Sequence, residues 1–243
     1  MDADLRRRRL LRSSAALLAA VGLVGQVPEV ALAQSAEPTA TPSLIPATPP
    51  VLGPSASGPE RGPRGVLGGE GELPAWVKPR ETWAAAGPVQ AYVPHTPTHV
   101  SVHHTGAPWN GRPSTEQALR NIQAFHIGPE REWEDIAYHF LVDLEGGIWA
   151  GRPPTVRGNP SVYYNSMGYV LICLLGDYNV QEPSEAQIAA VTNTAAWLIR
   201  RFNLPTDAIT GHRDHAPTSC PGTNLYRLVQ EQSLSRGVQA LLK

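Results

Sequence analysis

The chain has 243 residues and a formal net charge of −1 at pH 7, and no block of like charge runs through its body. This charge pattern excludes the basic footprint that nucleic-acid-binding proteins carry. The 24 prolines and 22 glycines are many for a globular protein and are unevenly placed, so the chain must be divided before its fold is considered.

The first 33 residues have the pattern of an export signal. A basic run over residues 6–12 precedes an apolar stretch over residues 13–25, and "ALA" at residues 31–33 is a small-x-small cleavage site. The apolar stretch is short and mild for a membrane span. The arginines also resemble the twin-arginine pattern, with an ordinary secretory signal as the alternative. We expect an exported protein, periplasmic, wall-associated or extracellular, with no membrane span after signal cleavage.

A linker follows the signal. Residues 34–72 contain 8 prolines, 7 glycines and no aromatic residue, so they have too little apolar surface to offset the entropy of ordering. We predict an exposed, extended linker over residues 34–74. All six tryptophans and all seven tyrosines lie from Trp76 onward. Residues 75–243 are therefore expected to form one domain with a sizeable core.

Five segments of this domain have the patterns of β-strands. Residues 98–104 alternate apolar and polar side chains, and residues 169–175 are apolar throughout, as in a strand covered on both faces. A glycine turn predicts a hairpin between two further strands. The remaining strands are expected over residues 136–143, 148–151 and 208–210.

Three helices are predicted between and after these strands. Ser114 with Gln117, and Ser184 with Gln187, are capping boxes ahead of helical patterns, and a third helix is expected to begin near Asn224. Strands and helices interleave, which predicts an α/β fold with a mixed central β-sheet flanked by about three α-helices. His126 ends the first predicted helix, where a protonated histidine would interact favourably with the helix dipole.

The loop "GHRDHAPTSCPG" (residues 211–222) places His212 eight positions before Cys220. A disulfide between Cys220 and Cys173 is one reading, because the protein is expected to be exported. It would need the loop to fold onto the strand that carries Cys173. The other reading is a metal site, because zinc takes histidine nitrogen and cysteine sulfur and a catalytic zinc keeps three protein ligands.

The strand over residues 98–104 offers the third ligand. Val100, Val102 and His104 share one face of the strand, whereas Ser101 and His103 share the other. The apolar face should meet the core. We therefore favour His103 over His104 as the residue that points toward a cleft and a metal.

These residues carry a resemblance to a known family. The stretch from about residue 80 to residue 226 resembles the zinc-dependent N-acetylmuramoyl-L-alanine amidases, a family that includes peptidoglycan recognition proteins and phage lysozyme-type amidases. Each short motif is weak alone, but their order along most of the domain is specific. The motifs are "RETW" (80–83), "VHHT" (102–105), "WEDIAYHFLVD" (133–143), "NSMGYVLICLLGDYN" (165–179) and "GHRDHAPTSCPG" (211–222).

The resemblance implies roles for particular residues. Its zinc ligands fall on His103, His212 and Cys220, its active-site tyrosine on Tyr138, and its catalytic lysine or threonine on Thr218. The implied cofactor is Zn²⁺ and the implied partner is peptidoglycan, both glycan strand and stem peptide. The implied reaction is hydrolysis of the amide bond between N-acetylmuramic acid and L-Ala by a single catalytic domain, which we expect to be monomeric.

Two tryptophans are candidate substrate-binding residues. Trp109 and Trp133 could line a cleft for sugar or stem peptide, although large aromatic side chains more often pack in a core. The chain also departs from the family. It lacks the cysteine pair that follows the first ligand in many animal members, and Glu132-Trp133 stands where a Gly-Trp pair accompanies preference for diaminopimelate-type stems.

Two other functions remain open. Members of this family that only bind peptidoglycan have typically lost a zinc ligand, often the cysteine, whereas this chain retains all three and Tyr138. A non-catalytic recognition module is thus the alternative, and a zinc amidase acting on another amide is a third reading.

Overall fold

The computed structural model describes residues 73–243. The predicted export signal over residues 1–33 lies outside the described residues, as does the predicted linker apart from its last two residues. Leu73, one of those two, already packs against the core of the domain. No helix in the described part of the chain has the length and apolar character needed to cross a membrane.

A mixed sheet forms the centre of the domain, as predicted, but it has six strands, because β1 (Val77–Lys78) was not predicted. The strand order is β1-β4-β3-β5-β2-β6, and every neighbouring pair is parallel except the β3–β4 hairpin. The strands are β1 (Val77–Lys78), β2 (His99–His104), β3 (Phe140–Val142), β4 (Ile148–Ala150), β5 (Tyr169–Leu174) and β6 (Ile209–Gly211). The strand β5, with its continuous apolar sequence, lies at the centre and is buried on both faces.

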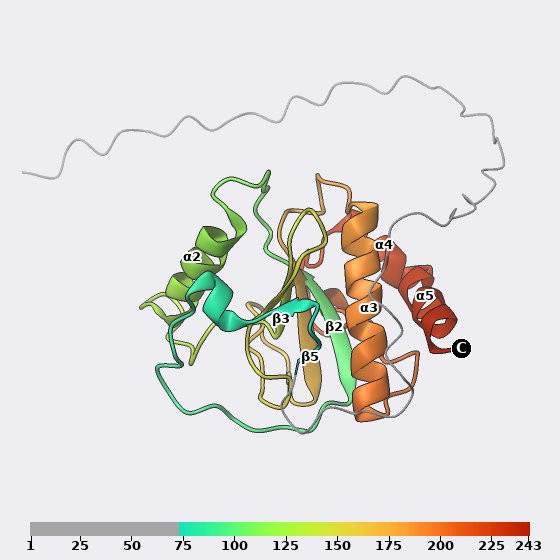
Figure 1. Cartoon of the computed structure of the whole chain (residues 1–243), viewed down its shortest axis with the longest axis horizontal. Helices are drawn as coiled ribbons and strands as arrows, with labels where there is room; N and C mark the ends of the chain where they lie inside the picture. The colour runs from blue at the N-terminus through green and yellow to red at the C-terminus, as the bar shows by residue number, and fades with distance from the viewer. Residues whose placement is uncertain (1–72) are drawn as a thin grey trace, which may run out of the picture. The chain divides into compact units, whose positions relative to one another are not determined.

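Helices cover both faces of the sheet. On one side lie α3 (Glu185–Phe202), α4 (Thr223–Gln230) and α5 (Ser233–Leu242), and on the other lies α2 (Thr115–Ile127), together with the 3₁₀ helix η1 (Arg80–Trp83) (Figure 1). Val100 and Val102 of β2 belong to the first core. Leu171 and Cys173 of β5 belong to the second. The alternation on β2 therefore directs Ser101 and His103 to the α2 side, which is the side of the cleft described below.

Of the two predicted capping boxes, one forms completely and the other only in part. At α3, Ser184 and Gln187 form the full capping box. At α2, Ser114 accepts the Gln117 backbone N–H at 3.4 Å, but the Gln117 side chain donates to Asn121 instead of returning to the cap. A fourth helix, α5, was not predicted, because the chain turns between α4 and α5 with Gln232 in the left-handed region (φ 56°).

The strand predicted over residues 136–143 is wrong in its first half, because only Phe140–Val142 pair as β3. The buried guanidinium of Arg152 donates to the carbonyls of Asp135 and Ile136, so a side chain satisfies groups that a longer strand would have paired. Tyr138 and His139 still form backbone hydrogen bonds with Arg152, Gly151 and Leu171, and Tyr138 lies on the α2 side of the sheet.

Two buried histidines accept backbone hydrogen bonds in this part of the fold. Nδ1 of His139 accepts the Leu171 N–H at 2.8 Å, and Nδ1 of His126 accepts the Ala137 N–H at 3.1 Å. Burial lowers the pKa of each to about 3. The expectation that His126 acts as a helix-end cation is therefore wrong, since its ring is neutral near pH 7.

We predict that the metal-free domain loses stability as the pH falls from 7 to 5. In the unfolded chain a histidine has a pKa of about 6.5 and takes up a proton, while His126 and His139 stay neutral in the folded state. Their stabilisation is present above pH 6.5 and is lost below it, at up to about 1.4 kcal/mol per histidine per pH unit. Urea titrations at pH 7, 6 and 5 measure this slope, and a constant free energy of unfolding would contradict it.

Candidate metal centre and cleft

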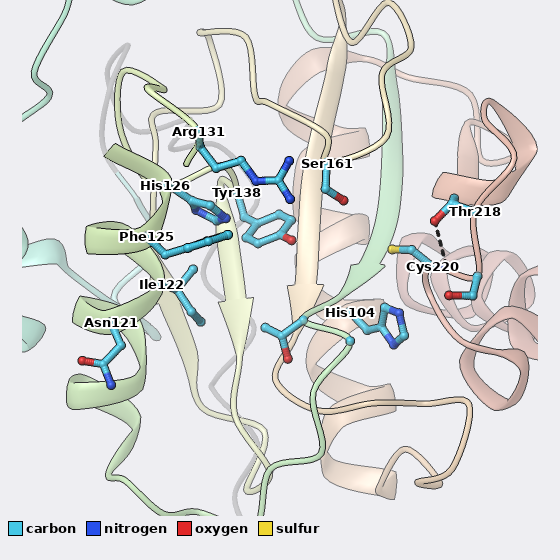
Figure 2. Close-up of a pocket in the computed structure, with 13 residues that line it drawn as sticks. His104, Asn121, Ile122, Phe125, His126, Arg131, Tyr138, Ser161, Thr218 and Cys220 are labelled. Carbon is cyan, nitrogen blue, oxygen red and sulfur yellow. Dashed lines mark hydrogen bonds between the residues drawn. The ribbon is translucent and has the colours of Figure 1, made fainter. Parts of the chain in front are cut away.

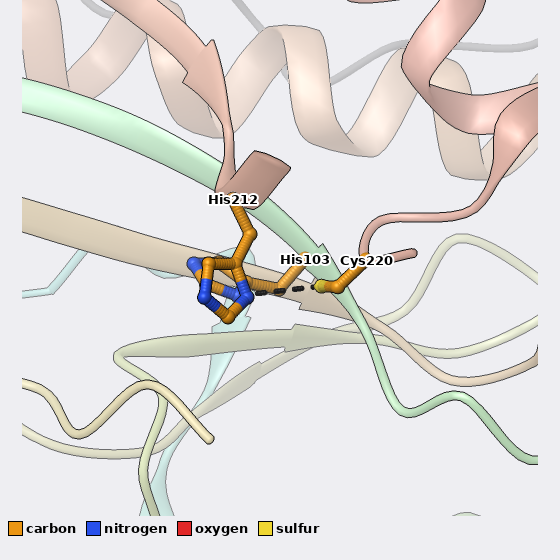
Figure 3. Close-up of side chains that lie close together, drawn as sticks. All are labelled: His103, His212 and Cys220. Atoms are coloured by element: carbon orange, nitrogen blue, oxygen red, sulfur yellow. Dashed lines mark hydrogen bonds between the residues drawn. The ribbon is translucent and has the colours of Figure 1, made fainter. Parts of the chain in front are cut away.

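Three side chains converge at the carboxyl ends of β2 and β6. His103 lies near the end of β2, and His212 directly follows β6, which pairs with β2 through Val102 and Gly211. The following loop returns Cys220 to the same point. Their ligand atoms all lie within 4.8 Å of one another and all three residues are buried (Figure 3). His103 Nδ1 lies 3.6 Å from the Cys220 sulfur, and the two ring centroids are 4.7 Å apart.

Hydrogen bonds on the far side of each ring fix its orientation. His212 Nε2 lies 3.0 Å from the carbonyl oxygen of Val162. A carbonyl oxygen only accepts, so Nε2 carries the proton and Nδ1 has a free lone pair. His103 Nε2 lies 3.0 Å from the Ser101 hydroxyl. Such outer partners are typical of metal-bound histidines, whose second ring nitrogen is almost always hydrogen-bonded.

One buried atom lacks a partner at this point. His212 Nδ1 is buried and has no hydrogen bond to any of the described residues. A buried polar atom without a partner costs about 1–3 kcal/mol, and such an atom in a native structure calls for an explanation. Here it faces a second imidazole and a thiol. The donor set and its geometry fit a metal ion.

The three groups are neutral without a metal. Burial lowers the pKa of both His103 and His212, the former well below its ordinary value. Burial also raises the pKa of the Cys220 thiol to about 12. A metal that binds here must therefore displace the thiol proton, because only the thiolate is a strong ligand.

The two cysteines are both free thiols. Cys173 lies in β5 opposite His103 and is fully buried. The reading in which Cys173 and Cys220 form a disulfide is therefore wrong.

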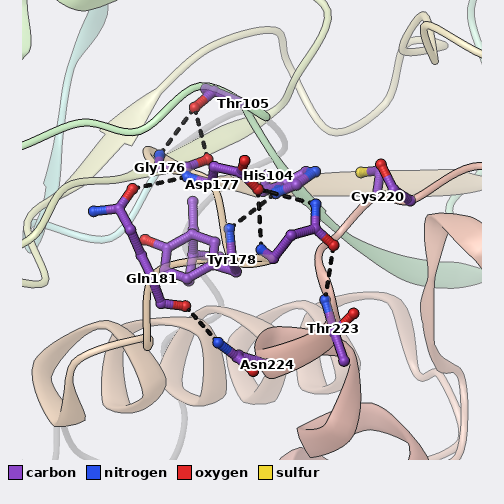
Figure 4. A network of polar contacts seen from close by, with 12 residues as sticks. His104, Thr105, Gly176, Asp177, Tyr178, Gln181, Cys220, Thr223 and Asn224 are labelled. Carbon is purple, nitrogen blue, oxygen red and sulfur yellow. Dashed lines mark hydrogen bonds and ion pairs between the residues drawn. The ribbon is translucent and has the colours of Figure 1, made fainter. Parts of the chain in front are cut away.

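A polar network behind the site holds the loop that bears Cys220 (Figure 4). His104 points away from the three ligand atoms, and its Nδ1 accepts the Tyr178 N–H at 3.2 Å. Burial lowers its pKa to about 4, so the ring is neutral beside Asp177. The backbone N–H of Asn224 donates to the Tyr178 carbonyl, and its side chain donates to the Gln181 carbonyl. The start of α4, just after Cys220, is thus tied to the loop that follows β5.

A cleft of about 460 Å³ opens beside the three residues (Figure 2). Tyr138 and Thr218 both line it, as their predicted roles require. Burial, and then the nearby thiols, raise the pKa of Tyr138 well above its ordinary value, so its hydroxyl stays protonated. The Thr218 hydroxyl oxygen accepts the Cys220 N–H at 3.2 Å. The complete lining is His104, Thr105, Gly106, Asn121, Ile122, Phe125, His126, Arg131, Tyr138, Ser161, Thr218, Ser219 and Cys220.

Neither of the two predicted tryptophans is among the residues that line this cleft. Trp109 donates its indole N–H to the Pro113 carbonyl. Trp133 packs against His126, with 4.8 Å between the ring centroids. Trp133 instead lines a second, smaller hollow of about 120 Å³ together with Tyr163.

Sequence reasoning missed the wall that faces Tyr138. Asn121, Ile122 and Phe125 line the cleft from α2. Phe125 follows the other two at i+4 and i+3, and this helical spacing is a signal that could have found them. Arg131 lies on the loop after α2, where its position gave no signal. The acceptor for His212, the carbonyl of Val162, has no side-chain signature at all.

Known proteins are similar to this chain in sequence. A family model described as N-acetylmuramoyl-L-alanine amidase matches residues 93–223. The N-acetylmuramoyl-L-alanine amidase of Sus scrofa is 35% identical over 136 residues, which cover 53% of this chain but only 22% of that protein's length. Peptidoglycan-recognition protein SC2 of Drosophila simulans is 31% identical over 138 residues, or 56% of this chain and 74% of the relative.

Solved structures agree with the sequence comparisons. Peptidoglycan recognition protein-LE, solved in complex with tracheal cytotoxin, superposes with a TM-score of 0.58 at 28% identity. The match covers 64% of this chain and 92% of that structure.

We predict that Ser101→Ala weakens metal binding without unfolding the domain. The change removes the oxygen that holds His103 Nε2, and loss of such an outer partner typically costs about 10- to 100-fold in affinity. Titration with Co²⁺, followed by its thiolate charge-transfer absorption, measures the effect. Ser166→Ala is the matched control, because Ser166 is also a buried serine but bonds to the Gly158 carbonyl. Equal affinities in the two variants would contradict the assignment.

Proposed function

Because the chain belongs to the N-acetylmuramoyl-L-alanine amidase family, we propose that it hydrolyses the amide bond between N-acetylmuramic acid and L-Ala in peptidoglycan with the help of zinc. The observation that carries the proposal is the buried group of His103, His212 and Cys220 at the edge of an open cleft. The pig relative bears the name of this reaction, and the structure of peptidoglycan recognition protein-LE contains a peptidoglycan fragment.

Zinc is the metal that this donor set suits best. Two imidazole nitrogens and one thiolate match the three protein ligands of a catalytic zinc, which leaves a coordination position open. Within residues 73–243, no fourth histidine, cysteine or carboxylate joins the group. Bound zinc supplies a polarised carbonyl and a water whose pKa is lowered to about 7.

Tyr138 is proposed to stabilise the charge that develops on the scissile carbonyl oxygen. Its ring lies 5.7 Å from that of His103, and its hydroxyl remains protonated because burial raises its pKa. A protonated hydroxyl in a site shielded from water is a strong donor toward a developing oxyanion. Thr218 is proposed to donate from the opposite wall, because its oxygen accepts the Cys220 N–H and its own proton remains free to donate.

We propose that residues 1–33 direct export, that the following Pro/Gly-rich residues tether the domain, and that the protein acts as a monomer on peptidoglycan outside the cytoplasm. Stem-peptide binding is proposed for the cleft walls and, in the second hollow, for Trp133. The backbone N–H of Trp109 donates to the Gln181 side chain, so Trp109 is proposed to hold the loop that follows β2.

The direct test is digestion of purified peptidoglycan by the zinc-loaded protein, with and without a chelator. Mass spectrometry should find new L-Ala amino termini and intact muramic acid, and the chelator should abolish both. A protein that binds peptidoglycan but releases no termini in excess zinc would be a recognition module. Cleavage of a different amide would indicate the third reading.

We predict that Tyr138→Phe lowers the hydrolysis rate on the order of 10²–10³-fold with zinc content unchanged. The substitution keeps the packed ring and removes only the hydroxyl. Thr218→Ala should have a smaller effect in the same direction. Release of L-Ala amino termini gives the rate and elemental analysis gives the zinc content. Wild-type activity in Tyr138→Phe would exclude Tyr138 from catalysis.

Cys220→Ser is expected to separate hydrolysis from binding. A serine hydroxyl stays protonated near neutral pH and is a poor zinc ligand, so most zinc and nearly all hydrolysis should be lost. The fold should survive, because the domain has two apolar cores that do not depend on the ion. The variant should still sediment with insoluble peptidoglycan. Full activity in this variant would overturn the metal assignment.

A further inference from the structure

The cleft contains one formally charged side chain, Arg131. It is the only arginine, lysine, aspartate or glutamate among the residues that line the cleft. Figure 2 shows Arg131 extending from its loop above Tyr138 toward Ser161. The cleft wall therefore presents a single positive charge near the proposed reaction centre.

The loop that carries Arg131 is held in place by backbone hydrogen bonds. The N–H groups of Arg131 and Glu132 both donate to the Gly128 carbonyl, at 3.1 and 2.8 Å, and the Trp133 N–H donates to the His126 carbonyl at 2.9 Å. The guanidinium carbon lies 5.4 Å from the Phe125 ring centroid and 5.3 Å from that of Trp133. Two aromatic rings thus support the guanidinium group and leave its N–H donors unused.

Arg131 makes no ion pair and no side-chain hydrogen bond with any other described residue. Glu130 and Glu132 are its sequence neighbours, but both are exposed and neither pairs with it. Arg152 shows the opposite arrangement, because its guanidinium is buried and bonded to Glu134, Asn159 and backbone carbonyls. The donors of Arg131 are therefore available to a ligand, whereas those of Arg152 are occupied within the fold.

Arg131 and Tyr138 line the same cleft, and Figure 2 shows the Arg131 side chain above the Tyr138 ring. A ligand group that pairs with Arg131 therefore lies on the same side of the cleft as Tyr138. A guanidinium fork matches a carboxylate in geometry and charge and forms two parallel hydrogen bonds with it.

We propose that Arg131 is a specificity-determining residue that pairs with a free carboxylate of the peptide stem, the one nearest to the scissile amide. This inference rests on the proposed function and adds a preference to it. Stems in which this carboxyl group is free are preferred, and stems in which it is amidated leave the guanidinium unpaired in the cleft.

The test uses two soluble N-acetylmuramoyl tripeptides that differ at one group. The α-carboxyl of the second stem residue is free in one and amidated in the other, and the terminal carboxyl is amidated in both. We measure kcat/KM for each with the zinc-loaded protein, Arg131→Gln and Arg131→Lys. Arg236→Gln is the control for net charge, because Arg236 is exposed on α5, across the sheet from the cleft.

The wild type should prefer the free carboxylate by about tenfold or more, the range expected of a hydrogen-bonded charge pair. Arg131→Gln should lower the rate on that substrate alone and bring the ratio near one. Arg131→Lys should retain part of the preference, since lysine keeps the charge but not the fork, and Arg236→Gln should retain all of it. Equal rates in the wild type, or a parallel loss on both substrates in Arg131→Gln, would overturn the inference.

Failure of the hydrolysis proposal can be distinguished from failure of the inference about Arg131. If the wild type cleaves neither compound, the hydrolysis proposal fails, and the affinities of the two compounds for wild type and Arg131→Gln, measured by calorimetry, decide the role of Arg131. A tenfold preference that disappears in Arg131→Gln supports the inference even then. Equal affinities in both proteins overturn it.

Discussion

The site depends on two hydrogen bonds that face away from it. The Val162 carbonyl and the Ser101 hydroxyl hold the outer nitrogens of His212 and His103, and so turn both Nδ1 atoms toward Cys220. Without them the rings could rotate or change tautomer, and the three ligand atoms would lose their common centre. The rest of the domain supports this arrangement, because pairing of β2 with β6 brings the two histidines together and the contacts of α4 return the cysteine loop.

Burial keeps the titratable groups neutral on both sides of Cys220. Around the ligands it keeps the imidazoles neutral, as metal ligation requires, and keeps the thiol protonated, so that a binding metal must displace that proton. In the cleft it keeps Tyr138 protonated and His126 neutral, so hydrogen-bond donors remain while charge is removed. Arg131 is the exception, since two aromatic rings support its charge at the cleft wall without neutralising it.

The sequence predicts those features that depend on side-chain periodicity. The alternation on β2 separated His103 from His104 correctly, because Val100 and Val102 enter the core under α3 while Ser101 and His103 face α2. The capping box at Ser184 likewise marked the start of α3. Features that depend on tertiary contacts could not be predicted from side-chain periodicity. The buried Arg152 shortened a predicted strand, and packing placed the indole rings of Trp109 and Trp133 outside the cleft lining.

The central claim, one metal held by His103, His212 and Cys220, is tested most directly by diffraction from crystals of the zinc-loaded protein at the zinc absorption edge. We expect one anomalous peak per chain, about 2.0–2.1 Å from each Nδ1 atom and about 2.3 Å from the cysteine sulfur. Ring contacts from Nε2 to Ser101 and Val162 should persist. No peak at this position, or a peak bonded to either histidine through Nε2, would contradict the account.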